Sequence, residues 1–177
     1  MKVGIICAQE LEECEALLVY DLLFRTEIQV DLIALNQLDI TSSHNLTFKA
    51  NKLIKDVDLK EYDCIVLPGG QPGTMNLEKS EIVQEAIDYF MANNKLIAAL
   101  CSAPSILIHK GLLDHGQFTC FPGSEANKRS LKVKAYQHNN IITGNGLGGT
   151  IEFAALIIKN LFDEEKANEI LKRIQYI

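Results

Sequence analysis

The sequence predicts an α/β fold in which a mostly parallel central sheet lies between layers of helices. Short apolar runs alternate along the chain with longer stretches of helical periodicity, an order typical of βαβ units. The apolar runs are nearly uninterrupted, as expected of strands whose two faces are both buried. With 177 residues, 47% of them hydrophobic, the chain can bury a sizeable core, so we expect residues 1–177 to form a single domain.

The first half of the chain is expected to contain three strands and two helices. Leucines at helical spacing indicate the first helix, and Ser80 is the expected N-cap of the second. The third strand ends in a loop too rich in Gly and Pro to continue either element. In chain order we expect a strand at 2–7, a helix at 11–24, a strand at 28–35, a short hairpin at 41–50, a strand at 63–67, a loop at 68–73 and a helix at 80–92.

The second half is expected to continue the alternation of strands and helices. Gly111 is expected to end the first of its helices, and the run His138-Asn139-Asn140 is a typical turn between two strands. In chain order we expect a strand at 96–100, a helix from 104, strands at 118–121, 133–136 and 141–143, a glycine loop at 144–149, and helices at 150–161 and 164–174.

Cys101 is the strongest candidate for a reactive group. It directly follows the expected strand 96–100, and Pro104 stands in the first turn of the next helix, where a missing backbone N–H costs nothing. A thiol at such a strand-to-helix elbow faces free N–H groups and the positive end of the helix dipole, which predicts a lowered thiol pKa and a nucleophile. A free Cys is more often a small core residue, but this position favours the functional interpretation.

Glu15 is the candidate partner of the thiol. It lies in the first turns of the expected helix 11–24, near the helix face that points inward. Because the carboxyl ends of parallel strands meet at one edge of a sheet, Glu15, the pair Gly69-Gly70 and Cys101 are expected to converge there. A buried carboxyl group tends to stay protonated, and it can donate a hydrogen bond to a thiolate or act as general acid and base.

The glycine-rich loops and the serines leave several interpretations open. Gly69-Gly70 is either a simple turn or a pair of bare N–H groups aimed at an oxyanion. The loop 144–149 fits the spacing GxGxxG, but it lacks the Lys-Ser/Thr ending of a nucleotide-binding loop and comes late in the chain, which argues against nucleotide binding. Neither Ser102 nor Ser105 stands in a GxSxG elbow, which argues against a serine hydrolase.

Charge and composition exclude several classes of partner. The formal net charge of −6 argues against nucleic acid or an anionic membrane surface as the main partner. No apolar run has the length of a membrane span, and the apolar start of the chain is too short and too strand-like for a signal peptide. We therefore expect a cytoplasmic protein.

The cysteines and histidines show no metal-type spacing. The five Cys, an odd number without a CxxC pair, are expected to be free thiols. The four His pair with neither Cys nor carboxylates at ligand spacing. Glu10, Glu12 and Glu13 are explained by the preference of carboxylates for a helix N-terminus. We therefore expect no metal and no cofactor.

Four short segments occur in an order and spacing that make a specific combination: Glu12-Glu13-Cys14-Glu15, DCIVLPGG at 63–70, AALCSAP at 98–104 and GGTIEFA at 148–154. Together they resemble the ThiJ/PfpI superfamily, and within it the small dimeric branch of the parkinsonism-associated deglycase and bacterial YajL. The resemblance covers nearly the whole chain. It implies a flavodoxin-like three-layer α/β sandwich and a homodimer.

The resemblance also implies a role for each matching residue. Cys101 matches the family's nucleophilic, oxidation-prone cysteine, and Glu15 matches the buried glutamate that forms a hydrogen bond with it. Gly70 and Ser102 match the positions whose backbone N–H groups line the oxyanion pocket. Protease branches usually carry a His immediately after the Cys, so Ser102 argues against a protease.

Two departures from the family pattern make the expected pocket less polar. Members with glyoxalase activity commonly place a His before a Pro after the elbow helix, where this chain has Phe121. The glycine loop also lacks the usual Ser-Arg pair and reads TGNG at 143–146. Cys120 is a candidate second thiol beside this position. His44, from the 41–50 hairpin or from a dimer partner, is a candidate replacement for the missing proton carrier.

These residues support two functions. In the first, the Cys101 thiolate attacks a small α-oxoaldehyde such as methylglyoxal, or its adduct, and a 2-hydroxy acid is released without a cofactor. In the second, the chain is a non-enzymatic redox sensor or stress-protective protein in which peroxide oxidises Cys101 to a sulfenic and then a sulfinic acid. The missing His favours the second function, whereas the range of activities in the family favours keeping the first. A pocket that binds without chemistry is a weaker third alternative.

Overall fold

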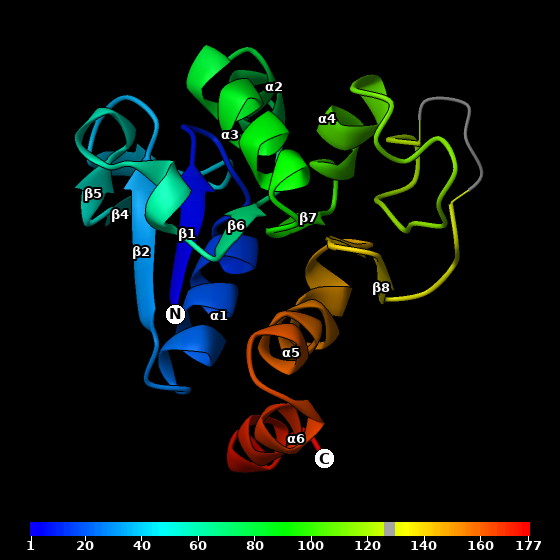
Figure 1. Ribbon diagram of the computed structural model, residues 1–177. Helices are drawn as coiled ribbons and strands as arrows, with labels where there is room; N and C mark the ends of the chain where they lie inside the picture. Colours follow the sequence, from blue (N-terminus) through cyan, green and yellow to red (C-terminus); the bar gives the residue numbers. More distant parts are fainter. Residues whose placement is uncertain (126–129) are drawn as a thin grey trace.

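The computed structural model describes residues 1–125 and 130–177. Seven strands form one sheet in the order β5-β2-β1-β6-β7-β9-β8, and only the β8–β9 pair is antiparallel (Figure 1). Strands β1, β2, β6, β7 and β9 thus follow the spatial order 2-1-3-4-5 of a flavodoxin-like sheet, which confirms the predicted fold class. The strands are β1 (Lys2–Cys7), β2 (Gln29–Ala34), β5 (Lys52–Leu53), β6 (Cys64–Leu67), β7 (Leu96–Leu100), β8 (Ala135–His138) and β9 (Ile141–Gly144).

Helices cover both faces of the sheet. Figure 1 shows α5 and α6 on the opposite side of the sheet from α2, α3 and α4, and buried residues of α1 belong to the same core cluster as those of α5 and α6. A separate hairpin of β3 (Asp39–Thr41) and β4 (Thr47–Lys49) follows β2. The helices are α1 (Glu13–Phe24), α2 (Gly73–Glu78), α3 (Glu81–Ala92), α4 (Pro104–His109), α5 (Thr150–Leu161) and α6 (Glu164–Arg173).

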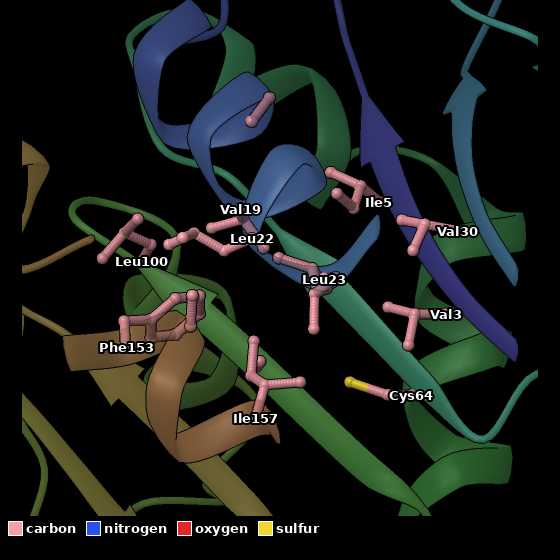
Figure 2. Close-up of a cluster of buried hydrophobic side chains, with 14 of the residues drawn as sticks. Val3, Ile5, Val19, Leu22, Leu23, Val30, Cys64, Leu100, Phe153 and Ile157 are labelled. Carbon is pink, nitrogen blue, oxygen red and sulfur yellow. The ribbon is translucent and has the colours of Figure 1, made fainter. Parts of the chain in front are cut away.

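Alternate side chains of each central strand enter different halves of the core, because successive side chains of a strand point to opposite faces. In β7, Leu96, Ala98 and Leu100 pack toward α1, α5 and α6, whereas Ile97 and Ala99 pack toward α2, α3 and α4. Figure 2 shows the first of these layers, where Leu100 and Phe153 approach Leu22 of α1. Because helices pack on both of its faces, β7 has a fixed orientation, and this fixes the position of Cys101 directly after the strand.

Most predicted elements are confirmed with small shifts at their ends. The expected segments 2–7, 96–100 and 150–161 match the structure, and the hairpin expected at 41–50 begins two residues earlier, since β3 begins at Asp39 and β4 ends at Lys49. The strand predicted at 133–136 is displaced to Ala135–His138, because the turn is made by Asn139-Asn140, where Asn139 takes a left-handed φ of 52°.

The strand predicted at 118–121 is wrong, because the N–H groups of Thr119 and Phe121 donate to Thr143 Oγ1 and to the Cys101 carbonyl at the elbow rather than to a neighbouring strand. This segment runs instead as irregular chain. Thr119 anchors it: its N–H donates to Thr143 Oγ1 (3.0 Å) and its hydroxyl donates to the Val133 carbonyl (2.8 Å). The short helix α2 was not predicted, because glycine and proline precede it and it is too short for a clear apolar period.

Among the described residues, no helix has the length and apolar character needed to cross a membrane.

Candidate active site

The elbow after β7 is held by the backbone of Cys101. Its N–H donates to the Gly144 carbonyl (2.9 Å), and its own carbonyl accepts from the Phe121 N–H (2.7 Å). Between these two bonds Cys101 adopts a left-handed φ of 63°, a conformation that costs a residue other than glycine about 1 kcal/mol or more. The chain then turns, and α4 begins with Pro104 in its first turn, as predicted. The fold thus imposes a strained backbone on the residue that carries the thiol.

Glu15 contacts the thiol from the first turn of α1. Its side chain is 1% exposed, forms a hydrogen bond with Cys101, and accepts a 2.9 Å bond from the Gly69 N–H at Oε2. The three segments expected to converge at the carboxyl edge of the sheet therefore do converge there. The structure brings Glu15, Gly69 and Cys101 into contact, although they come from α1, the β6–α2 loop and the β7–α4 elbow.

Close approach explains the two glycines of the β6–α2 loop. A Cβ on Gly69 would lie 2.6 Å from Cys101 Cβ and 2.7 Å from Glu15 Oε2, which no real side chain tolerates. Gly70 has a φ of +94°, and a Cβ there would lie 2.3 Å from the Glu12 backbone nitrogen. Both glycines let the loop contact the site. This contact favours the interpretation of a functional glycine pair over that of a simple turn.

Backbone N–H groups of Gly70 and Ser102 form hydrogen bonds with the Cys101 thiol group. Two donors converging on one sulfur also suit an oxygen atom that develops negative charge beside it. The Ser102 hydroxyl is engaged elsewhere, 2.7 Å from the Thr74 hydroxyl of α2. Thr74 is fully buried and helps to fix the elbow. Sequence reasoning missed Thr74 because it lies in the helix that was not predicted.

The acid–base properties of the thiol and carboxyl group are coupled. Burial raises the pKa of Glu15 to about 7, although hydrogen bonds from Cys101 and Gly69 oppose the shift. Burial and the adjacent Glu15 carboxylate raise the pKa of the Cys101 thiol to about 12, opposed by the N–H groups of Ser102 and Gly70. The expected lowering of the thiol pKa is therefore wrong while Glu15 is ionised. Helix α4 has only six residues, so its dipole is weak beside a full negative charge.

Phe121 lines the opening beside the thiol. Its side chain is 52% exposed, and a Cβ placed on Gly146 would lie 3.4 Å from Phe121 Cδ2 and 3.7 Å from Cys101 Sγ. Phe121 and the sulfur therefore face the same short segment of the glycine loop. Exposed Leu147 follows in that loop. This rim of the site is apolar where the resemblance would place an imidazole.

Among the described residues, the polar contacts of the two remaining candidates, Cys120 and His44, do not include the Cys101 thiol. Cys120 is buried, its sulfur lies 4.0 Å from Glu125 Oε2, and burial raises its pKa to about 11. His44 lies on the β3–β4 turn, where its Nδ1 is 3.1 Å from Glu13 Oε2. Within the parts of the chain described, the polar contacts of His44 involve Ser42, Ser43 and the start of α1 rather than Cys101.

A hollow of about 670 Å³ lies at the other edge of the sheet, lined among others by Asp63, Lys95 and Asn140. These residues stand where β6, β7 and β9 begin, whereas ligands of open α/β sheets bind beyond the carboxyl ends of the strands. We therefore assign the candidate active site to the elbow at Cys101 rather than to this hollow.

Comparison with known proteins gives consistent results. Residues 1–160 match the sequence profile described as the DJ-1/PfpI family. "Protein DJ-1 homolog B" of Arabidopsis thaliana is 31% identical over 166 residues, which cover 91% of this chain but only 38% of that longer protein. "Glutathione-independent glyoxalase DJR-1.2" of Caenorhabditis elegans is 27% identical over 169 residues, 93% of this chain and 90% of that one. The solved structure of oxidized Toxoplasma gondii DJ-1 superposes with a TM-score of 0.94 at 30% identity, covering 99% of this chain and 98% of that one.

Proposed function

The chain belongs to the DJ-1/PfpI family, and from this premise we propose that it is a cysteine-dependent, cofactor-free enzyme of the glyoxalase or deglycase type. Its substrates are methylglyoxal-like α-oxoaldehydes or their adducts on amines and thiols. The observation that carries the proposal is the hydrogen bond between the buried Glu15 carboxyl group and Cys101, beside two convergent backbone N–H groups. The relative from Caenorhabditis elegans, named a glutathione-independent glyoxalase, supports the same chemistry.

The reaction begins at the sulfur. When Glu15 holds the shared proton, its O–H donates to the sulfur and no carboxylate repels the thiolate, so Cys101 becomes nucleophilic in that protonation state. The sulfur bonds to the aldehyde carbon, and the aldehyde oxygen takes the proton from Glu15 to give a hemithioacetal, which leaves Glu15 as a carboxylate. The N–H groups of Gly70 and Ser102 stabilise the negative charge that develops on this oxygen.

Glu15 then acts as base and acid in turn. Its carboxylate removes the hydrogen from the former aldehyde carbon and returns it to the former ketone carbon, while the hydroxyl proton on the first carbon passes to the ketone oxygen. The first carbon is oxidised to a thioester and the second is reduced to an alcohol, so no external oxidant or reductant is consumed. Water hydrolyses the thioester to a 2-hydroxy acid and restores the thiol. A carboxyl group with a pKa of about 7 exchanges protons in both directions near neutral pH.

The test is the formation of lactate from methylglyoxal in the absence of glutathione. Cys101→Ser and Glu15→Gln are both expected to abolish turnover, because the first lacks the thiol and the second cannot accept a proton. Cys14→Ser is the matched control, since Cys14 is an exposed thiol one residue from Glu15. Wild-type turnover no greater than that of Cys101→Ser would refute the enzymatic proposal.

A redox role is the second candidate, and the partly exposed sulfur favours it. The donors at Gly70 and Ser102 that suit an oxyanion also suit the oxygen atoms of a sulfenic or sulfinic acid. The oxidized form of the Toxoplasma gondii relative supports this alternative. Intact mass after graded peroxide tests it: Cys101 must be oxidised faster than the other four cysteines, Cys7, Cys14, Cys64 and Cys120.

We further propose that the chain acts as one domain, as a homodimer, in the cytoplasm. Helix α1 offers an apolar surface for a second copy, since Phe24 is largely exposed and stacks on Tyr20 with 5.8 Å between ring centroids. Sedimentation velocity of the wild type and of Phe24→Glu tests the assembly. A wild-type monomer at micromolar concentration would contradict it.

A further inference from the structure

A second cluster of reactive side chains lies outside the thiol site. His44 Nδ1 is 3.1 Å from Glu13 Oε2 and 3.6 Å from Glu12 Oε2, and one ligand atom from each of the three residues lies within 4.8 Å of the others. The two glutamates come from the start of α1, whereas the histidine comes from the β3–β4 turn. The cluster therefore joins two elements that are far apart in the sequence.

The backbone holds these two segments together independently of the three side chains. The Glu10 N–H donates to the Thr41 carbonyl (2.8 Å), and the Ser43 N–H donates to the Leu11 carbonyl (2.9 Å). The Ser42 hydroxyl accepts from the backbone N–H groups of His44 (3.3 Å) and Leu46 (3.2 Å), which fixes the turn itself. The cluster is thus preorganised by the fold.

The charges and burial of the cluster fit a cation. The side chains of Glu13 and Glu12 are only 11% and 17% exposed, whereas that of His44 is 64% exposed. Two carboxylates form the inner side, and one imidazole closes the outer side. A single imidazole carries at most one positive charge, so it cannot neutralise both carboxylates. A divalent cation between the three groups would neutralise both.

The spacing of the donor atoms fits a small first-row metal ion. Bonds from Zn²⁺ to imidazole nitrogen and carboxylate oxygen are roughly 2.0–2.1 Å, so neighbouring ligands of a tetrahedral ion stand about 3.3 Å apart. The two distances from His44 Nδ1, 3.1 and 3.6 Å, lie on either side of that value. A donor set of one nitrogen and two oxygens suits Zn²⁺ and its first-row neighbours, and three protein ligands leave a position open for water.

We propose that Glu12, Glu13 and His44 form a binding site for a divalent first-row metal ion of the Zn²⁺ type. The site is separate from the proposed thiol chemistry, and neither proposal depends on the other. It replaces the sequence-based expectation that the chain holds no metal. Bound metal would link the β3–β4 turn to the start of α1 and stabilise both.

The test is titration of the full-length, chelator-treated protein with Co²⁺ and with Zn²⁺. Co²⁺ reports its ligands by absorption, because thiolate ligation adds a near-ultraviolet charge-transfer band that nitrogen and oxygen ligands lack. We expect one Co²⁺ per chain without that band, and a Tm that rises with Zn²⁺. His44→Ala and Glu13→Gln should each weaken the affinity for the metal by about tenfold or more. Losing even a residue that only forms a hydrogen bond with a metal ligand weakens metal binding by that factor.

Two controls make the result specific. His109→Ala removes a histidine paired with a single carboxylate, 2.6 Å from Glu78 Oε1, and should leave the affinity unchanged. Cys101→Ser should also bind normally. Equal affinity in the wild type and His44→Ala, or loss of binding in Cys101→Ser, would overturn the proposed site. Neither outcome would bear on lactate formation, which separates failure of this proposal from failure of the proposed enzyme.

Discussion

Glu15 Oε2 accepts a 2.9 Å hydrogen bond from the N–H of Gly69, and the same oxygen lies only 2.7 Å from the point where a Cβ on residue 69 would stand. The carboxyl group is thus held against bare backbone on one side and against Cys101 on the other. The position of the carboxyl group depends on the absence of a side chain at residue 69.

Gly69→Ala tests this dependence. The added methyl group would also lie 2.9 Å from the Leu100 carbonyl oxygen, so backbone as well as side chains must move. We expect a loss of about 1–3 kcal/mol in the free energy of unfolding, as is typical of overpacking, together with loss of Cys101-dependent turnover. Urea denaturation and lactate assays measure the two effects. Gly148→Ala is the control, since a Cβ there has open space around it, and an equal loss in both variants would contradict the interpretation.

The raised pKa of Glu15 makes stability depend on pH. Between the ordinary carboxyl pKa of 4.5 and the raised pKa of about 7, the folded chain keeps a proton at Glu15 that the unfolded chain has released. Because the unfolded state then binds fewer protons, the free energy of unfolding falls as pH rises through this window, by about 3 kcal/mol in total. The stabilisation is complete below the unfolded pKa and is lost as pH passes the folded one.

Urea denaturation at a series of pH values from 4.5 to 8 measures this slope. Glu15→Gln cannot titrate and should flatten the slope, whereas Glu85→Gln, on the exposed side of α3, should preserve it. An unchanged slope in Glu15→Gln would show that Glu15 has an ordinary pKa in the folded chain.

The thiol should report the protonation of its neighbour. Since Glu15 and Cys101 are coupled, alkylation of Cys101 by iodoacetamide is expected to follow a two-step pH profile, with the lower step near pH 7 where Glu15 titrates. Glu15→Gln should leave a single step. Mass spectrometry of each cysteine measures the rates, and exposed Cys14 serves as an internal reference. A single-step profile in the wild type would show that the titrations of Glu15 and Cys101 are not coupled.

Phe121 should limit the proposed enzyme. It lines the opening beside the sulfur and cannot transfer a proton, so Phe121→His is expected to raise lactate formation by about tenfold or more through general acid–base catalysis. The half-exposed position should tolerate the change with little loss of stability. Phe121→Leu, which restores no proton carrier, should remain at the wild-type rate. Equal rates in all three proteins would show that Glu15 alone suffices.

The fold and the centre of the site could be read from the sequence, because both follow from local patterns. Buried apolar runs predict the strands, and parallel topology brings Glu15, Gly70 and Cys101 to one edge. The irregular path of 118–121 could not be predicted, since the same apolar pattern suits a strand, and the hydrogen bonds of Thr119 to Thr143 and of Phe121 to Cys101 join segments far apart in the sequence.

The electrostatics of the thiol site and the arrangement of the proposed metal ligands depend on distances in space that the sequence does not reveal. The rise in the Cys101 pKa depends on the burial of the thiol and on how close the Glu15 carboxylate lies, neither of which spacing along the chain reveals. In the cluster of Glu12, Glu13 and His44, the histidine lies 31 or more positions after the glutamates, so no short ligand motif predicts the cluster. Such features appear only when separate segments are placed in space.

The two-sided packing of β7 has a consequence for length changes near the elbow. Its side chains alternate between two helical layers. Because Cys101 directly follows Leu100, the number of residues in the strand sets the direction in which the Cys101 side chain points. Inserting or deleting one residue between Leu96 and Leu100 would exchange the layers and turn the sulfur away from Glu15. Descendants of this sequence can exchange one apolar residue for another in β7, but they cannot change its length by a single residue and keep the site.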